Sequence, residues 1–201
     1  MKKLGLRILE YMQSKNYEIK DLNIIYIEGV NPDTFALNSD TENYWNDTRN
    51  LILEDGTVVM SAQATTEPGT YYTDNPLNPK GAARIAFGHY KEAWAFGMHK
   101  KQKALVQVGE ITVHRDLNKD GVRTGDKTYT GLFEINQHTT GDSPYASIPD
   151  LVGRWSAGCL VGKVPKTHYE IFLPTLRQFG YPVWDTTVLD GSLLHSLGVL
   201  G

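Results

Sequence analysis

Apolar and polar positions along the chain predict one N-terminal helix followed by a series of strands. Residues 3 to 16 place apolar side chains on one face of a helix, which predicts an amphipathic helix. The next run, LNIIYIEGVNPD (22–33), is rich in β-formers and closes on Gly and Asn-Pro, so it predicts a strand and a turn. Residues 50–66 form two β-rich arms around Asp55-Gly56, which is the strongest hairpin signal in the chain.

The middle of the chain continues in the same way. The runs GAARIAFGHYKEAWAFGM (81–98), KALVQVGEITVHRD (103–116) and TGLFEINQH (130–138) predict further strands, separated by turns rich in Gly and Asn. Hydrophobic residues return to helical spacing only near the C-terminus. The central part of the protein is therefore expected to be β-structure.

The C-terminal part predicts a helix and an apolar tail. Residues 166–180 space Leu, Ile and Phe as a helix does, with Pro174 interrupting or restarting it and Gly180 as its C-terminal cap. The tail GSLLHSLGVLG (191–201) is apolar enough to dock on the core. We expect a mainly β protein of the α+β type with a few flanking helices.

No repeat, linker or low-complexity stretch divides the chain. We expect residues 1–22 to form an N-terminal helical extension and residues 23–201 to form a single domain. The 19 glycines among 201 residues suit a fold with many turns.

Charge and hydropathy exclude several classes of function. Lys and Arg number 20 against 23 Asp and Glu, and the basic residues are scattered, so no nucleic-acid partner is expected. No apolar run reaches about 18 residues, which predicts no membrane span. Arg7, Glu10 and Gln13 interrupt the N-terminal apolar positions, so we expect an amphipathic helix and no export signal.

Cys159 is the only cysteine, which excludes an internal disulfide and a cysteine-based zinc site. It leaves three interpretations: a buried apolar filler, an incidental thiol or a nucleophile. A nucleophilic thiol needs a base, which is usually a histidine held by a third group. Of the six histidines, His138 stands out because it ends a predicted strand, where rigid backbone presents the side chain to a neighbouring loop.

The spacing around these two residues resembles a known family. The run TGLFEINQH, 17 further residues and then SAGC are similar to the signature of the L,D-transpeptidase (YkuD-type) catalytic domain, in which a histidine precedes Ser/Thr-His-Gly-Cys. The run TYTGLFEI also resembles a strand of that family, and LILEDGTVVMSAQATTEPG resembles its opening hairpin. Together these features span roughly residues 49–164. The resemblance implies a β-sandwich or open barrel.

The resemblance also implies roles for individual residues. Cys159 would be the nucleophile that accepts the acyl group, and His138 its general base. Gly158 would let backbone N–H groups near the cysteine face the developing oxyanion, and Ser156 would orient the loop. The chain departs from the family at Ala157, where the family has histidine, and in lacking the Arg or Asn that commonly follows the cysteine.

Four other residues are candidates for binding the substrate. Arg154 has the charge to bind a substrate carboxylate, with a solvated surface arginine as the alternative. His99 is either a second polar group of the same cleft or a surface histidine. Tyr71 and Tyr72 belong to a segment rich in Tyr, Pro and Asn (65–84), which suits a loop that packs glycan or peptide and equally suits a structural loop.

One stretch resembles the start of a calcium-binding loop. DLNKDGVRTGDK (116–127) has Asp116, Asn118 and Asp120 at alternate positions, but its twelfth residue is Lys127 and its flanks are predicted strands. The pattern favours a hydrogen-bonded turn and leaves weak calcium binding open. No zinc-hydrolase motif is present, and neither a metal nor a cofactor is expected.

The sequence thus predicts a cysteine-dependent enzyme that cleaves an amide bond of a peptidoglycan stem peptide through a thioester. The alternatives are an endopeptidase or carboxypeptidase of the phage lytic type, and a non-catalytic wall-binding or virion protein. Without an export signal, we expect cytoplasmic synthesis and action at the cell wall after another export route or lysis. The oligomeric state stays open.

Overall fold

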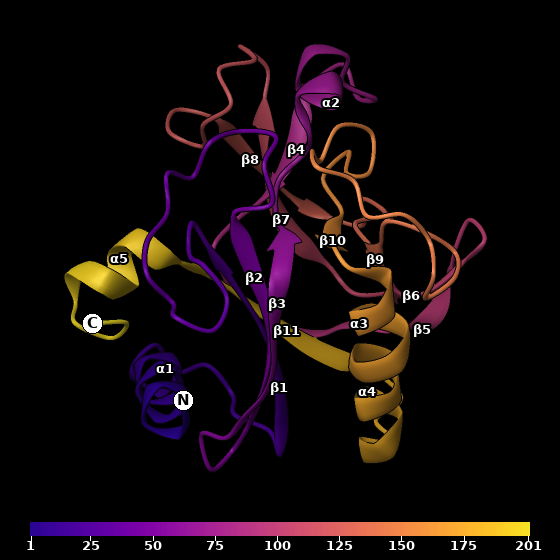
Figure 1. The fold of residues 1–201 in the computed structure, drawn as a ribbon. Coiled ribbons are helices and arrows are strands. Elements are labelled where there is room, and N and C mark those ends of the chain that lie inside the picture. Colours follow the sequence, from indigo (N-terminus) through magenta and orange to yellow (C-terminus); the bar gives the residue numbers. More distant parts are fainter.

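Eight strands of the computed structural model, which describes residues 1–201, close into a barrel in which each strand has a hydrogen-bonded neighbour on both sides (Figure 1). In order around the ring, they are β1 (Leu22–Glu28), β11 (Trp184–Asp190), β5 (Gly88–His99), β6 (Gln102–Gln107), β9 (Gln137–Thr139), β10 (Leu160–Gly162), β3 (Val58–Thr65) and β2 (Asp47–Leu53). The mainly β expectation is confirmed. The ring is closed, so the expected sandwich or open barrel is corrected to a closed barrel.

The predicted hairpin forms one wall of this barrel. Strands β2 and β3 pair antiparallel, and Gly56 adopts a φ of 82° in the turn between them, a conformation that favours glycine. The register shifts between Leu51 and Ile52, whose partners are Met60 and Val58, so Val59 is the extra residue of a β-bulge in β3. Local sequence therefore determined this element, as the Asp-Gly signal predicts.

A second, three-stranded antiparallel sheet consists of β4 (Ala82–Ile85), β7 (Ile111–Asp116) and β8 (Lys127–Gly131). The predicted strand over residues 130–138 is wrong in its middle: β8 ends at Gly131, β9 starts at Gln137, and residues 132–136 belong to neither. The chain crosses from one sheet to the other here. Glu134 takes a positive φ of 58° in the crossing. This crossing segment borders the candidate site described below.

The predicted helices are present. Helix α1 (Lys2–Ser14) confirms the N-terminal prediction, and Gly180 ends the C-terminal helix with a left-handed φ of 69°. Pro174 lies in the first turn of α4 (Leu173–Phe179), after a π-helical turn η1 (His168–Phe172), so it restarts the helix as expected. The remaining helices are α2 (Thr70–Asp74), α3 (Pro165–Thr167) and α5 (Gly191–Ser196). None of the helices has the length and apolar character that crossing a membrane requires.

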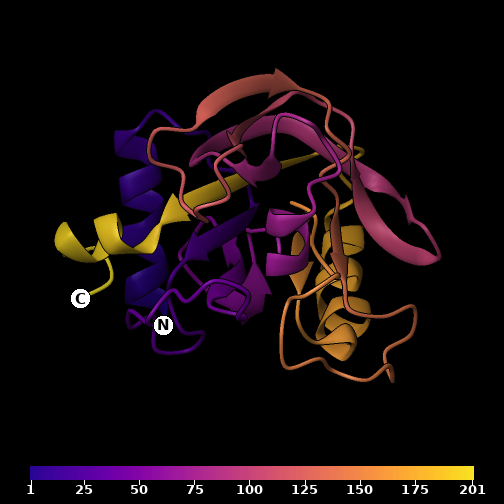
Figure 2. The ribbon, with the colours of Figure 1, turned by 90° about the horizontal axis from the view of Figure 1, so that it is seen from above.

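The core has two main parts, separated by the wall of the barrel. Alternate residues of β1 face opposite sides: Tyr26 packs in the cluster that contains Trp94, whereas Ile25 and Ile27 pack in the cluster of α1 and α5. Figures 1 and 2 show α1 and α5 together on one side of the barrel and α3 and α4 on the other. The apolar tail docks as predicted, with Leu200 buried in the second cluster.

Candidate active site

Two neighbouring strands bring the predicted nucleophile and base together. His138 lies in β9 and pairs in register with Val161 of the parallel strand β10, which starts immediately after Cys159. His99 ends β5 and joins them. One ligand-type atom from each of Cys159, His138 and His99 lies within 4.8 Å of the other two. The predicted proximity of thiol and imidazole is therefore present in the structure.

The hydrogen bonds of His138 set its tautomer. Its Nδ1 lies 2.9 Å from the carbonyl oxygen of Thr139 and 3.1 Å from Oε1 of Gln102. Because both neighbours are acceptors, Nδ1 carries the proton and donates it. The other nitrogen, Nε2, is buried and has no partner in the chain. His138 is thus held as a neutral imidazole whose remaining lone pair is free to accept a proton.

His99 stacks on this ring in a second fixed tautomer. The two ring centroids are 4.1 Å apart and the planes differ by 7°. The Asn136 amide accepts from the Gln107 backbone N–H with its oxygen, so its nitrogen donates to Nδ1 of His99 at 3.0 Å. Nδ1 of His99 is therefore unprotonated, and burial followed by the charge of Lys100 lowers the pKa of this imidazole. When His138 takes up a proton, its charged imidazole therefore stacks on a neutral imidazole.

The thiol is also held in its neutral form. Burial raises the pKa of Cys159 to about 11, although a hydrogen bond from the Asn136 backbone acts in the opposite direction. Burial, then the neighbouring His99, lowers the pKa of His138 to about 3. Sγ donates to the carbonyl oxygen of Glu134 at 3.6 Å. At neutral pH the pair is therefore thiol and imidazole, and proton transfer has to accompany attack on a substrate.

Ser156 and Gly158 shape the loop before the cysteine. Ser156 Oγ donates to the carbonyl oxygen of Cys159 at 2.8 Å and accepts from the Gly158 N–H at 3.1 Å. Gly158 has a φ of 125°, and an added Cβ would lie 2.7 Å from the carbonyl oxygen of Ala83. Only glycine fits this position. Its N–H is already bonded to Ser156, so the expected oxyanion donors do not include the N–H of Gly158 itself.

Cys159, His138 and His99 line a cleft of about 360 Å³. Three cationic side chains, Lys100, Arg115 and Arg154, line it together with one acidic side chain, Glu134. Ala157 lines it as well, at the position where the resembled family has histidine. The cleft therefore has the charge to bind a ligand that carries carboxylates.

The other predicted binding residues gather at the rim of this cleft. Arg154 is exposed, lines the cleft, and stacks its guanidinium 3.8 Å above the Tyr71 ring. Tyr72 lines the cleft, whereas Tyr71 does not and instead packs edge-on against Tyr72 at 5.1 Å. The segment 65–84 is not one loop, because it contains α2 and the start of β4.

Sequence reasoning did not identify Gln102, Asn136, Thr139, Lys100 or Arg115. Asn136 and Thr139 lie within two residues of His138, so their position was a usable signal for groups that orient its ring or the sulfur. Gln102 reaches His138 from β6, across a pairing that no local pattern reveals.

The same three side chains have the ligand chemistry of a zinc site, since a thiolate and two imidazoles are common zinc ligands. Their arrangement is unsuited to one ion as it stands. The rings of His99 and His138 lie in nearly parallel planes 4.1 Å apart, so in-plane lone pairs of the two rings cannot both point at one ion, and Nδ1 of each ring is already hydrogen-bonded. Acid–base chemistry needs no such rearrangement.

The calcium-like stretch forms the hydrogen-bonded turn that the sequence favoured. The carboxylate of Asp116 accepts from the backbone N–H of Asp120 at 3.1 Å and of Gly121 at 3.0 Å. Asp116 also lies 3.7 Å from the buried guanidinium of Arg84. Its oxygens are thus engaged inside the protein.

Comparisons with known proteins add no assignment. No protein-family model matches the chain, and neither does any curated protein or solved structure.

Proposed function

We propose that this protein is a cysteine-dependent peptidoglycan-processing enzyme that cleaves an amide bond of a stem peptide through a thioester, as the resemblance to L,D-transpeptidases implies. One observation carries the proposal. A neutral, oriented His138, whose buried Nε2 has no hydrogen-bond partner, has a ring nitrogen within 4.8 Å of the Cys159 sulfur, and both residues line one cleft. A buried nitrogen without a partner costs stability, and a role in accepting the thiol proton would explain why that cost is retained.

The reaction follows from these contacts. As Sγ of Cys159 attacks the amide carbon, its proton passes to Nε2 of His138, and the carbonyl becomes an oxyanion. The new imidazolium is stabilised by its bonds to Thr139 and Gln102. It then gives the proton to the leaving amine, the C–N bond breaks and a thioester remains. Attack by a second amine or by water releases the acyl group and restores the thiol.

The charges of the cleft fit this substrate class. Stem peptides carry free carboxylates, and Lys100, Arg115 and Arg154 supply the complementary charge, with Glu134 as the one acidic group. Ala157 leaves the wall without the histidine of the resembled family. This cleft lining is compatible both with a transferase and with a plain hydrolase of the phage lytic type. Either enzyme would act at the cell wall.

Defined muropeptides separate the candidate functions. The purified protein is incubated with disaccharide-tetrapeptide monomers and cross-linked dimers, and the products are analysed by mass spectrometry. New cross-links indicate a transferase, and released fragments indicate a hydrolase. Both products should disappear in Cys159→Ser, and His138→Ala should slow their formation by on the order of 10². His195→Ala, which changes an exposed histidine of α5, is the matched control and should match wild type. Retention of muropeptides without any product would support the wall-binding alternative and contradict the enzyme.

A second test uses trapping of the thioester. Enzymes of the resembled family are acylated by carbapenems, whose leaving amine stays tethered. Intact-mass spectrometry should show one drug adduct, peptide mapping should place it on Cys159, and Cys159→Ala should not form it. Slow adduct formation in His138→Ala would support the general-base role. A protein that neither forms the adduct nor changes muropeptides is not the enzyme proposed.

A further inference from the structure

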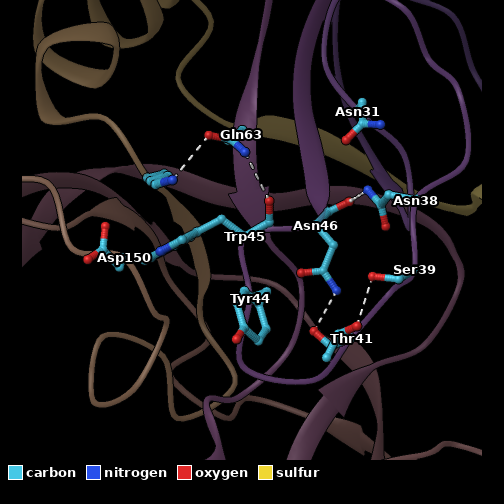
Figure 3. Close-up of a pocket in the computed structure, with 10 residues that line it drawn as sticks. Asn31, Asn38, Ser39, Thr41, Tyr44, Trp45, Asn46, Gln63 and Asp150 are labelled. Atoms are coloured by element: carbon cyan, nitrogen blue, oxygen red, sulfur yellow. Dashed lines mark hydrogen bonds between the residues drawn. The ribbon is translucent and has the colours of Figure 1, made fainter.

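A second cavity, outside the thiol cleft, has the lining of a saccharide site. Figure 3 shows the side chains that line it. Its volume is about 400 Å³. Its wall comes from the segment that leads from Asn31 to Asn46, from Gln63 of β3, and from Asp150 and Lys163 on either side of the cysteine loop. Neither the proposed catalytic groups nor the cationic side chains of the thiol cleft belong to it.

The chemistry of this wall selects one class of ligand. Four side-chain amides line it, from Asn31, Asn38, Asn46 and Gln63, together with the hydroxyl groups of Ser39 and Thr41. Amides and hydroxyls offer donors and acceptors side by side, as the hydroxyl and acetamido groups of a sugar do. The only charged residues are Asp150 and Lys163, whose charges balance, so a phosphate or a metal ion is not favoured.

Aromatic rings complete the site. Tyr44 lines the cavity with 55% of its surface exposed, which leaves a ring face for the C–H face of a pyranose. Trp45 lies beside it and is buried, with its indole N–H donating to the carbonyl oxygen of Pro149. The cavity thus combines an accessible aromatic side chain with a polar rim.

Internal hydrogen bonds hold the polar wall in place. The Asn38 amide donates to the Asn46 carbonyl oxygen at 2.7 Å, and the Asn46 amide donates to the Thr41 carbonyl oxygen at 2.8 Å (Figure 3). Lys163 Nζ contacts Oε1 of Gln63 at 3.3 Å and keeps further N–H groups for a ligand. Ordered side chains lose little conformational entropy on binding, which favours recognition of a weakly interacting sugar.

The cavity is connected to the thiol through Trp45. This side chain lines the cavity and also packs in one apolar cluster with Val152, Cys159 and Val161. Asp150 borders the cavity, while Arg154, four residues later in the same segment, lines the thiol cleft. One short stretch of chain therefore has the two cavities on its two sides.

We infer that this cavity binds a sugar of the glycan strand, an N-acetylated amino sugar, while the attached peptide reaches the thiol cleft. The assignment to peptidoglycan rests on the proposed function. Saccharide binding itself rests on the amides, the hydroxyls and Tyr44. Peptidoglycan is the polymer in which a sugar and a carboxylate-bearing peptide are covalently joined, which matches two neighbouring cavities of these two characters.

Binding is measured without turnover, in ¹⁵N-labelled Cys159→Ser protein. Adding the peptide-free disaccharide of N-acetylglucosamine and N-acetylmuramic acid should shift the side-chain amide signals of Asn31, Asn38 and Asn46. Chitobiose should shift the same signals, because it carries the same acetamido group, and maltose should not. Since the nucleophile is absent, a failure of the proposed enzyme activity leaves this result unaffected.

Two variants locate the site. Tyr44→Ala should weaken binding of the disaccharide at least tenfold, and Asn31→Ala, on another part of the wall, should weaken it severalfold. Tyr145→Ala is the matched control, because Tyr145 is a tyrosine with 86% exposure outside this wall. An amide spectrum that keeps its dispersion shows that each variant is folded. Absent shifts, shifts confined to the thiol cleft, or equal binding by Tyr44→Ala would overturn the inference, and equal shifts with maltose would overturn the amino-sugar assignment.

Discussion

Two groups of polar side chains inside the protein differ in where their polar atoms find hydrogen-bond and ion-pair partners. The thiol–imidazole group (Cys159, His138, His99) borders a cleft and leaves Nε2 of His138 without a partner. In the carboxylate–guanidinium group (Glu28, Asp47, Glu67, Arg84, Arg123), ion pairs join Glu28 and Glu67 to the two guanidinium groups, and the Thr66 hydroxyl contacts both Glu28 and Asp47. Arg84 Nε has no hydrogen-bond partner but lies 3.7 Å from the Asp116 carboxylate, and no member of the group lines the cleft. The first group keeps a hydrogen-bonding atom available for a ligand, whereas the second uses its charges to join separate parts of the fold.

Burial shifts the pKa values of the two groups in opposite directions, because it favours the neutral form of both the imidazole and the carboxyl group. It lowers the pKa of His138 to about 3, and it raises the pKa of Glu67 to about 7. Burial and the nearby Glu28 also raise the pKa of Asp47 well above its usual range. The Thr66 hydroxyl lies 2.7 Å from Glu28 and 2.9 Å from Asp47, and its single proton cannot serve both carboxylates. A proton retained on Asp47 resolves this contact.

The largest expected effect comes from removing one cation of the carboxylate–guanidinium group. Arg123 donates to both carboxylate oxygens of Glu28 at 2.6 Å. Arg123→Met leaves that carboxylate buried and unpaired, so the free energy of unfolding should fall by about 3–5 kcal/mol, measured by urea denaturation. Cys159→Ser, made in the other group, should change it by less than about 1 kcal/mol.

Arg177→Met is the matched control, because Arg177 is exposed and stacks on Phe96 without an ion pair. Equal stability of Arg123→Met and Arg177→Met would show that the Glu28 pair contributes nothing. A loss in Cys159→Ser as large as that in Arg123→Met would show that the thiol serves packing.

The next effect is a dependence of stability on pH that originates in the cleft. The imidazole of His138 takes up a proton below about pH 6.5 in the unfolded chain but only near pH 3 in the folded protein. Stability contributed by this group is therefore lost as the pH falls between these values. Between pH 7 and pH 4.5, the free energy of unfolding of His138→Gln should fall by about 2–3 kcal/mol less than that of wild type. Urea unfolding at each pH measures this difference. The exposed variant His195→Gln should follow wild type, and an unchanged slope in His138→Gln would contradict a buried neutral imidazole.

In the carboxylate–guanidinium group, Glu67 should make stability depend on pH in the opposite direction and by a smaller amount. The carboxyl of Glu67 has a folded pKa of about 7 against an ordinary value of 4.5, so its stabilising contribution is present at low pH and is lost as the pH rises through 7. As the pH rises from 5 to 7, the free energy of unfolding of Glu67→Gln should therefore increase by about 2 kcal/mol relative to that of wild type. The same urea unfolding measures it. Glu10→Gln, an exposed change on α1, serves as the reference. A gain of equal size in Glu10→Gln would rule out burial of Glu67 as its cause.

Several features could be predicted from the sequence because they depend on neighbouring residues. The N-terminal helix, the hairpin at Asp55-Gly56 and the cap at Gly180 follow from periodicity and turn chemistry within a few residues. The pairing of Cys159 with His138 came from a motif spacing, and the structure places the two side chains together. The catalytic role of this pair stays a prediction.

Other features required the tertiary structure because distant segments create them. The barrel closes only when β9 and β10 pair with strands far away in the chain, and the crossing between two sheets interrupts the strand predicted over residues 130–138. His99 and Gln102 reach His138 across strand pairings, and their tautomer-setting contacts have no signature in the local sequence. The requirement for glycine at position 158 has the same origin, because the carbonyl oxygen of Ala83, from a distant strand, occupies the place where a Cβ would lie. Local sequence thus identified the candidate thiol and imidazole, and long-range packing decided their protonation and the shape of the two cavities, because burial and hydrogen-bond partners exist only in the folded chain.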